Sequence, residues 1–343
     1  MSEPLRVAVV GLGYWGPNLL RNLVELDDAE VVTMCDSREE RLEHWGRRYP
    51  GIGRTASYMD LLSDDRVEAV VIATPVSTHF ELASRALEFG KHTFVEKPLA
   101  ASSDEAGELV HLARRAGRVL MPGHTFLYSP PVVLVKEMID RGDLGEIYFV
   151  SSSRVNLGLH QTDVSVVWDL GPHDFSILRY WLGESPESVS ALSRACVIPG
   201  MPDVAFVNMR YSSGTIAQIE LAWLAPSKLR RTTVVGSERM VVYDDTSGEP
   251  VRVFDSGATL PDPETFGEYQ LSYRTGDIVS PRVEPVEPIY RQMVDFCTAI
   301  RGGPQPRSSP MIGLEVVQVV EMVDCSLSFG GKPVERDLAA VIP

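Results

Sequence analysis

A glycine-rich segment, GLGYWG at 11–16, follows an apolar run and precedes a helical stretch. In such a GxGxxG pattern Gly11 permits a tight turn, Gly13 lets the backbone approach a pyrophosphate, and Gly16 allows a helix to pack closely on a strand. Free N–H groups at the start of that helix favour phosphate oxygens. The pattern predicts a dinucleotide site, although the same glycines could serve only to shape a turn.

Asp36 stands at the end of the next predicted strand, where an acidic side chain binds the adenosine ribose hydroxyls. Its charge would repel a 2′-phosphate, so NAD is favoured over NADP. The nearby Arg38 could accommodate that phosphate, which leaves NADP as the less favoured alternative. Ser37, Tyr14 and Trp15 are further predicted cofactor contacts, although the two aromatic side chains could equally pack against a second domain.

A second candidate is Lys97, in the tripeptide EKP at the carboxyl end of a later predicted strand. Ligands of open α/β sheets collect outside the carboxyl ends of the strands. A lysine there can hydrogen-bond a reacting hydroxyl and stabilise its alkoxide character, or it can be an ordinary solvated charge. The neighbours predicted to line the same cofactor site are Glu96, Thr74, Pro75 and His79.

A third candidate is the segment WDLGPHD at 168–174, in which Asp169 and His173 lie four residues apart at the start of a predicted helix. This spacing puts both side chains on one face of the helix. An imidazole near its working pKa can take a hydroxyl proton while a carboxylate orients it. A capping aspartate beside a structural histidine is the simpler alternative.

These residues need elements to position them, and the first 120 or so residues supply an alternating β/α pattern. Such alternation predicts a doubly wound parallel sheet, that is, a Rossmann domain. The predicted strands lie at 6–10, 31–35, 69–73, 93–96 and 119–121. The predicted helices lie at 17–25, 39–48, 81–89 and 104–116.

The pattern changes after residue 125, which predicts a Rossmann domain over 1–125 and a substrate-binding and oligomerisation domain over 126–343. The second domain reads as α+β, with a large, open, mostly antiparallel sheet. Its predicted strands lie at 147–155, 204–211, 215–221, 231–235 and 240–243, and its helices at 172–181, 290–300 and 313–329. The Pro/Gly/Asp-rich segment 246–286 is predicted to be irregular. One face of the sheet would need cover, which predicts a homodimer or homotetramer.

Composition narrows the function classes. A net charge of −15 disfavours nucleic acid and anionic membrane as partners. Four widely spaced cysteines form no CxxC, so neither a disulfide framework nor a metal site is expected. No apolar run is long enough to cross a bilayer, and a strand follows the N-terminus almost at once, which predicts a cytoplasmic protein.

Taken together, GLGYWG, VIATPVSTH, VEKPLA and WDLGPHDFSILRYWLG, in this order and spacing, resemble the glucose–fructose oxidoreductase/inositol dehydrogenase/MocA (Gfo/Idh/MocA) family. The resemblance extends over essentially the whole chain, including RRTTVVGSERMVVYDD and VEPIYRQMVDFCTAI. It is strongest to the bacterial sugar dehydrogenases that make 3-keto sugars for later transamination. That branch includes enzymes of nucleotide sugars, aminosugars and aminoglycoside antibiotics.

The resemblance implies that Lys97 is the catalytic lysine, His173 the general base and Asp169 its acidic neighbour. Arg154 and Asn156 match a stretch that lines the sugar pocket, although they could be ordinary polar residues of a strand end. Tyr128 and Trp168 complete the predicted substrate contacts. Many relatives carry an acidic residue three positions after the histidine, where this chain has Ser176 and instead places Asp174 directly after His173.

The predicted function is therefore oxidation of a secondary hydroxyl of a sugar or aminosugar, at C3, by hydride transfer to NAD. The ring would lie between the nicotinamide and the antiparallel sheet. The alternatives are a cyclitol dehydrogenase, a deoxysugar ketoreductase, or a catalytically silent NAD-binding regulator. The basic cluster KLRR at 228–231 could meet a diphosphate of a nucleotide sugar, or could be a solvated strand edge.

Overall fold

The computed structural model describes residues 3–158, 164–259 and 272–336 of the chain. By their contacts the residues form two compact units. Unit 1 joins Met1–Ser129 with Val286–Gln318, and unit 2 joins Pro130–Pro285 with Val319–Val341. The chain therefore returns to the first unit late in the sequence. The predicted division at 125/126 assigned this late segment to the second domain.

Unit 1 is built on a six-stranded sheet in the order β3-β2-β1-β4-β5-β6, in which all neighbours pair in parallel. This is the predicted Rossmann architecture. The β4 strand is buried at each of its four residues, as expected for a strand covered on both faces. The strands are β1 (Leu5–Val10), β2 (Ala29–Cys35), β3 (Gly53–Thr55), β4 (Ala69–Ile72), β5 (His92–Glu96) and β6 (Leu120–Gly123).

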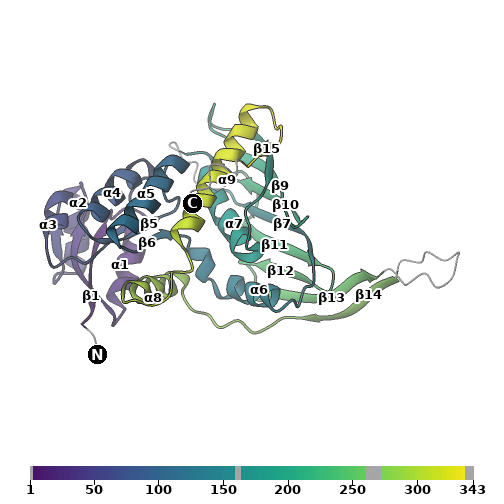
Figure 1. The fold of residues 1–343 in the computed structure, drawn as a ribbon, viewed down its shortest axis with the longest axis horizontal. Coiled ribbons are helices and arrows are strands. Elements are labelled where there is room, and N and C mark those ends of the chain that lie inside the picture. The colour runs from purple at the N-terminus through teal and green to yellow at the C-terminus, as the bar shows by residue number, and fades with distance from the viewer. Residues whose placement is uncertain (1–2, 159–163, 260–271, 337–343) are drawn as a thin grey trace. The chain divides into compact units, whose positions relative to one another are not determined.

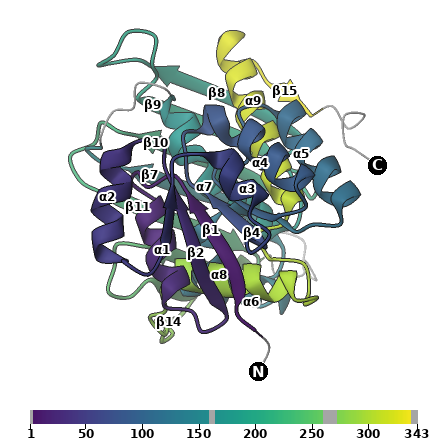
Figure 2. The ribbon, with the colours of Figure 1, turned by 90° about the vertical axis from the view of Figure 1, so that its left-hand side faces the viewer.

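Helices cover both faces of this sheet (Figures 1 and 2). The pair α4 and α5 packs on one face, and α1 and α8 pack together on the other. The helices are α1 (Gly16–Val24), α2 (Glu39–Arg48), α3 (Tyr58–Ser63), α4 (His79–Glu88), α5 (Ser103–Ala116) and α8 (Pro288–Ile300), with 3-10 turns η1 (Val76–Thr78) and η2 (Thr125–Tyr128). Helix α9 (Pro310–Ser328) begins in unit 1 and ends in unit 2.

Buried polar contacts attach the returning segment to the Rossmann core. Tyr128 donates its hydroxyl proton to Asp295 of α8 at 2.7 Å, and the same hydroxyl oxygen accepts from the N–H of Ser308 at 3.0 Å. Thr125 donates to the amide oxygen of Gln292 at 2.9 Å. These contacts explain why α8 belongs to unit 1 although it lies far along the chain.

Unit 2 contains a nine-stranded sheet in the order β14-β13-β12-β11-β7-β10-β9-β8-β15. Its pairs are antiparallel except β7 with β10, which confirms the predicted mostly antiparallel sheet. The strands are β7 (Ile147–Val155), β8 (Ser188–Arg194), β9 (Val204–Arg210), β10 (Ile216–Ala222), β11 (Leu229–Gly236), β12 (Met240–Asp244), β13 (Val251–Thr259), β14 (Ser272–Val279) and β15 (Val334–Glu335).

Helices α6 (Pro130–Asp140) and α7 (Val166–Leu182) pack on one face of the unit 2 sheet (Figure 1). The prediction that the second of these begins at residue 172 was wrong. Pro172 lies inside α7, where it lacks the N–H that would bond back to Trp168, and six helical residues precede it. Because α7 begins at Val166, Asp169 and His173 are both helical and lie one turn apart.

The prediction of an irregular segment over 246–286 was wrong at β13 and β14, which are strands, whereas residues 260–271 lie outside the described part of the chain. The β13 and β14 strands pair from Val253–Val279 to Thr259–Ser272, and β12 pairs with β13 only as far as Phe254. The outer half of this hairpin therefore has no third strand among the described residues. Glycine and proline in the segment concealed the alternating pattern of the two strands. No described helix is long and apolar enough to cross a membrane.

Candidate active site

The glycine turn of unit 1 has the geometry that a dinucleotide requires. Gly11 has φ +89°, and a Cβ there would lie 2.5 Å from the carbonyl oxygen of Ala73. A Cβ on Gly16 would lie 1.8 Å from the carbonyl oxygen of Gly11, so only glycine lets α1 start this close to the turn. A Cβ on Gly13 would meet nothing within 4 Å. The backbone at Gly13 thus borders open space, as a cradle for a pyrophosphate needs.

Asp36 is buried at the end of β2 and closes this turn. Its carboxylate accepts from the N–H of Leu12 at 2.7 Å and from the N–H of Arg38 at 2.9 Å. Burial opposes ionisation, but these hydrogen bonds and the Arg38 guanidinium outweigh it and hold the pKa of Asp36 below its ordinary value. A carboxylate ionised at neutral pH and held beside the glycine turn fits the ribose of NAD. Tyr14, Trp15 and Ser37, around the same turn, are all exposed.

His79 ties together two turns at the carboxyl edge of the unit 1 sheet. One ring nitrogen lies 2.8 Å from the carbonyl oxygen of Pro98, and the other lies 2.9 Å from that of Thr74. The side chain is buried, and burial lowers the pKa of His79 against the pull of both carbonyls. His79 therefore holds the turn after β4, which includes Pro75, against the turn after β5. His79 thus supports both turns of the candidate cofactor site, and its direct contact with a cofactor remains a prediction.

Lys97 follows β5 directly, is half-buried, and is joined to Pro98 by a cis peptide bond. Its backbone N–H donates to the buried Glu96 carboxylate at 3.2 Å. Burial raises the pKa of Glu96 to about 7, although the nearby Lys97 charge and this hydrogen bond act in the opposite direction. Glu96 also lies against Gly123 of β6, where a Cβ would come within 3.0 Å of the carboxylate.

His124 is a residue of this region that the sequence did not indicate. It follows β6, is fully buried, and neither ring nitrogen has a hydrogen-bond partner among the described residues. Burial, together with repulsion from the Lys97 charge, lowers the pKa of His124 to about 3. The imidazole therefore stays neutral and adds no positive charge beside Lys97.

In unit 2, α7 carries Asp169 and His173 one turn apart, and both are half-buried. Trp223, buried at the end of β10, donates its indole N–H to the Asp169 carboxylate at 3.0 Å. Sequence reasoning missed Trp223, because 54 residues separate the two partners. Asp169, one turn before His173, is thus held by a residue that directly follows β10.

Asn156, just beyond β7, lies at the same end of the unit 2 sheet as Trp223. Its N–H bonds to the carbonyl of Ala222, and the N–H of Gly158 bonds to the carbonyl of Trp223. The side-chain oxygen of Asn156 is buried without a hydrogen-bond partner among the described residues. It could accept from a ligand hydroxyl.

Arg154 and Asp174 form a buried ion pair that fixes α7 on β7. The side chains are 4% and 3% exposed, and Ser152 also donates to Asp174, at 2.8 Å. The attraction of Asp174 outweighs the burial that would lower the pKa of Arg154, so this pKa is raised. This pairing accounts for an acidic residue directly after His173.

The remaining predicted residues have internal partners in their own units. The indole N–H of Trp168 donates to Asp324 of α9 at 2.7 Å, and Tyr128 is buried with its hydroxyl bonded to Asp295. In the basic cluster, Arg230 of β11 pairs with Asp245, which directly follows β12. The structure thus gives Arg154, Trp168 and Tyr128 structural contacts, and their predicted roles toward a substrate remain predictions.

Comparison with known proteins decides the family. Residues 5–124 match the model of the oxidoreductase family with an NAD-binding Rossmann fold, and residues 132–242 match the GFO/IDH/MocA C-terminal domain. The chain belongs to the Gfo/Idh/MocA oxidoreductase family. It is therefore an NAD-dependent oxidoreductase whose relatives act on sugar-like and cyclitol substrates.

Among the relatives of this Gfo/Idh/MocA protein, scyllo-inositol 2-dehydrogenase (NAD(+)) of Bacillus subtilis is 28% identical over 77% of this chain and 82% of its own. D-apiose dehydrogenase of Paraburkholderia graminis is 26% identical over 98% and 91% of the two chains. The crystal structure of GenD2 from gentamicin A biosynthesis, in complex with NAD, is 27% identical, with a TM-score of 0.83 over 98% and 97% of the chains.

The buried carboxyl of Glu96 yields a test of stability. In the folded protein its pKa is raised from 4.5 to about 7, so the unfolded chain ionises first and the free energy of unfolding falls as pH rises across this window. Glutamine cannot ionise. In scans without cofactor, the thermal stability of Glu96→Gln relative to the parent should therefore rise between about pH 4.5 and pH 7, the window between the two pKa values.

The control for this comparison is Glu88→Gln, at an exposed position of α4. Its melting temperature should follow that of the parent protein across the same pH range. A constant difference between Glu96→Gln and the parent at every pH would contradict the raised pKa of Glu96.

The buried ion pair yields a second test. Arg154→Met leaves the Asp174 carboxylate buried without its guanidinium, which should lower the free energy of unfolding by about 3–5 kcal/mol. The double variant Arg154→Met/Asp174→Leu removes both charges and should regain most of that loss in urea unfolding. Equal losses of stability in the single and double variants would show that the loss in Arg154→Met does not come from an unpaired Asp174 charge.

Proposed function

We propose that the protein oxidises a secondary hydroxyl, at C3 of a sugar or aminosugar unit, to a ketone with NAD⁺ as hydride acceptor. The ketone would then be a substrate for transamination. The observation that carries the proposal is the pairing of two sets in one chain: an NAD cradle with Lys97 at its sheet edge, and a carboxylate–imidazole pair on α7. The similarity to GenD2 from gentamicin A biosynthesis supports the substrate class.

In this proposal Lys97 and His173 act on the same substrate hydroxyl. His173 accepts the hydroxyl proton at a ring nitrogen while Asp169 stabilises the imidazolium that forms. Lys97 donates a hydrogen bond to the oxygen as its negative charge develops. NAD⁺ held in the cradle would accept the hydride from the ring carbon. The hydride carries both electrons and His173 takes the hydroxyl proton, so the oxidation balances.

NAD rather than NADP is the proposed cofactor. Glycines 11, 13 and 16 would hold the pyrophosphate, and the ionised Asp36 would hold the adenosine ribose. A 2′-phosphate would meet the Asp36 carboxylate. Arg38 is already paired with Asp36, which reduces what its charge can offer to that phosphate.

A second candidate is oxidation of a cyclitol, favoured by the similarity to scyllo-inositol 2-dehydrogenase over most of the chain. The same residues would serve it, and would also serve ketone reduction in a deoxysugar pathway. A silent NAD-binding regulator is disfavoured, because a regulator has no need to keep Lys97, Asp169 and His173 together.

The experiment that tests the proposal is a screen for formation of reduced cofactor. The protein is mixed with NAD⁺ or NADP⁺ and with nucleotide-linked sugars, free hexoses, inositols or aminoglycosides. We expect NADH with an aminosugar or nucleotide sugar. Lys97→Ala should lower turnover about 100-fold or more while leaving the dissociation constant for NAD⁺ nearly unchanged.

Lys136→Ala, at a half-buried position of α6 where the side chain pairs with Asp140, is the control and should keep full turnover. Full turnover in Lys97→Ala would contradict the catalytic assignment. Reduced cofactor with inositols alone would transfer the assignment to the cyclitol candidate.

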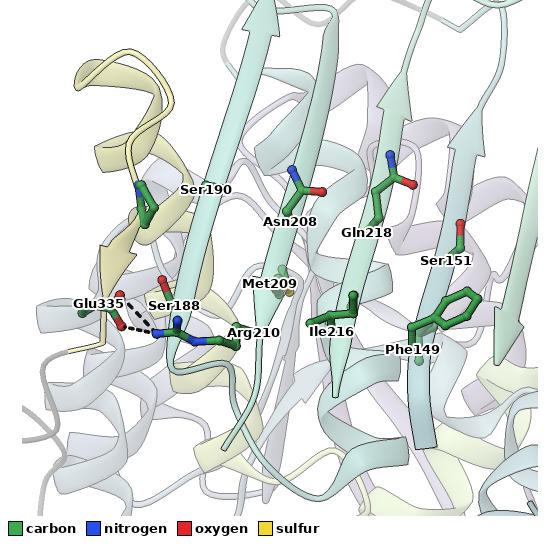
Figure 3. Close-up of a pocket in the computed structure, with 13 residues that line it drawn as sticks. Phe149, Ser151, Ser188, Ser190, Asn208, Met209, Arg210, Ile216, Gln218 and Glu335 are labelled. Carbon is green, nitrogen blue, oxygen red and sulfur yellow. Dashed lines mark hydrogen bonds and ion pairs between the residues drawn. The ribbon is translucent and has the colours of Figure 1, made fainter. Parts of the chain in front are cut away.

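We also propose that the open face of the unit 2 sheet binds a second copy of the chain. A pocket on this face is lined by strands β7, β8, β9 and β10, and Figure 3 shows its side chains in rows across them. Ser151, Gln218, Asn208 and Ser190 form one row by strand register. Apolar side chains exposed on the same face are Phe149, Leu192, Phe206 and Ile216.

The chemistry of this face favours self-association over another partner. Amide and hydroxyl groups both donate and accept, so a row of them can pair with its own copy across a two-fold axis. Arg210 and Glu335 at the edge of this face form an ion pair with no net charge. A nearly neutral face lets two copies of a chain with net charge −15 approach each other.

Ile216→Asp places a carboxylate in the middle of this face. The protein should then elute as a monomer, where the parent elutes as a dimer or tetramer in size-exclusion chromatography with light scattering. Val294→Asp, an exposed apolar position on α8, is the control and should not change the oligomeric state. An unchanged mass for Ile216→Asp would show that copies associate elsewhere or not at all.

A further inference from the structure

Trp223 holds one of the two groups proposed for proton transfer. It lies just after β10, is 1% exposed, and directs its indole N–H at one oxygen of the Asp169 carboxylate, 3.0 Å away. A buried indole N–H needs an acceptor, and here the acceptor is one of the groups proposed for proton transfer. We infer that Trp223 is a positioning residue, which acts on catalysis by holding Asp169 in the orientation that serves His173.

The backbone of Trp223 is itself well anchored. Its N–H bonds to the carbonyl of Asp203 at 2.9 Å, and its carbonyl accepts from Gly158 at 2.9 Å. The Asp203 carboxylate accepts the N–H groups of Cys196 and Val197. The indole therefore projects from a rigid point of the sheet onto the first turns of α7.

The hydrogen bond holds one oxygen of Asp169, on the helix face that also carries His173. Residues four apart on a helix face each other, so the carboxylate can meet the imidazole once its rotation is fixed. A hydrogen bond from an uncharged donor orients the carboxylate without cancelling its charge. Asp169 can thus raise the pKa of His173 by stabilising its protonated form.

Several other charged side chains in the described part of unit 2 have partners of their own. Arg154 of β7 pairs with Asp174, and Arg230 of β11 pairs with Asp245. Asp324 of α9 accepts the indole N–H of Trp168. Asp169, one turn before His173 on α7, is the carboxylate that we couple to His173, and Trp223 acts through it.

This inference rests on the proposed function, and its test needs no substrate. The protonation of His173 is followed by NMR of ¹³C-labelled histidine in the whole protein, with its signal assigned from His173→Gln. The variants are Trp223→Phe, Asp169→Asn and the double variant. Phenylalanine keeps an aromatic ring and removes the N–H.

We expect the pKa of His173 to fall in Asp169→Asn and to fall in the same direction in Trp223→Phe. The double variant should equal Asp169→Asn alone, because Trp223 acts only through Asp169. Additive shifts, a rise, or no shift in Trp223→Phe would overturn the inference. No shift in Asp169→Asn would instead remove the carboxylate–imidazole pair, and with it the proposed chemistry.

Trp181→Phe is the matched control. Trp181 lies on α7, is equally buried, and loses an indole hydrogen bond of 2.9 Å to the carbonyl of Val132. It should cost similar stability without moving the pKa of His173. If Trp223→Phe does not fold, the ¹⁵N indole signal of Trp223 in Asp169→Asn decides: a shift supports the hydrogen bond, and an unchanged signal overturns the inference.

Discussion

The close approach of Gly16 to the carbonyl of Gly11 is the constraint on which the organisation of unit 1 depends. A single Cβ at Gly16 would fall 1.8 Å from that oxygen. With glycine there, α1 begins at the end of β1 and its free N–H groups face the open space at Gly13. Asp36 then reaches the same turn through Leu12. Backbone geometry, rather than a cluster of charged side chains, therefore makes the cofactor cradle.

In unit 2, a helix rather than a backbone turn carries the candidate catalytic residues Asp169 and His173. The helix is held at two points. Trp223 of the sheet bonds to Asp169, and the buried Arg154–Asp174 pair lies just beyond His173. A contact on each side of the histidine restricts both sliding and rotation of α7. A buried ion pair adds little net stability. A shift of α7 that separated Arg154 from Asp174 would nevertheless cost free energy, because it would leave both charges buried and unpaired.

Regular patterns in the sequence predicted regular elements well. The helix at Glu39–Arg48 and the strand at Ile147–Val155 have the predicted bounds. Pro172 misled the prediction of α7 because local rules place proline at a helix start. Partners far apart in sequence, such as Trp223 with Asp169 or Tyr128 with Asp295, gave no local signal at all. The candidate acid–base residues could be named from sequence, but the groups that hold them could not.

Burial also shapes the electrostatics around Lys97. Burial raises the pKa of Glu96 to about 7 and lowers the pKa of His124 to about 3, while His79 is likewise shifted toward its neutral form. Between about pH 3 and pH 7, Glu96 and His124 are therefore both mostly uncharged. A lysine charge among neutral, buried groups is screened less than in water, so it acts more strongly on a developing oxyanion. The same burial that costs stability at Glu96 thus strengthens the interaction that the proposed chemistry needs.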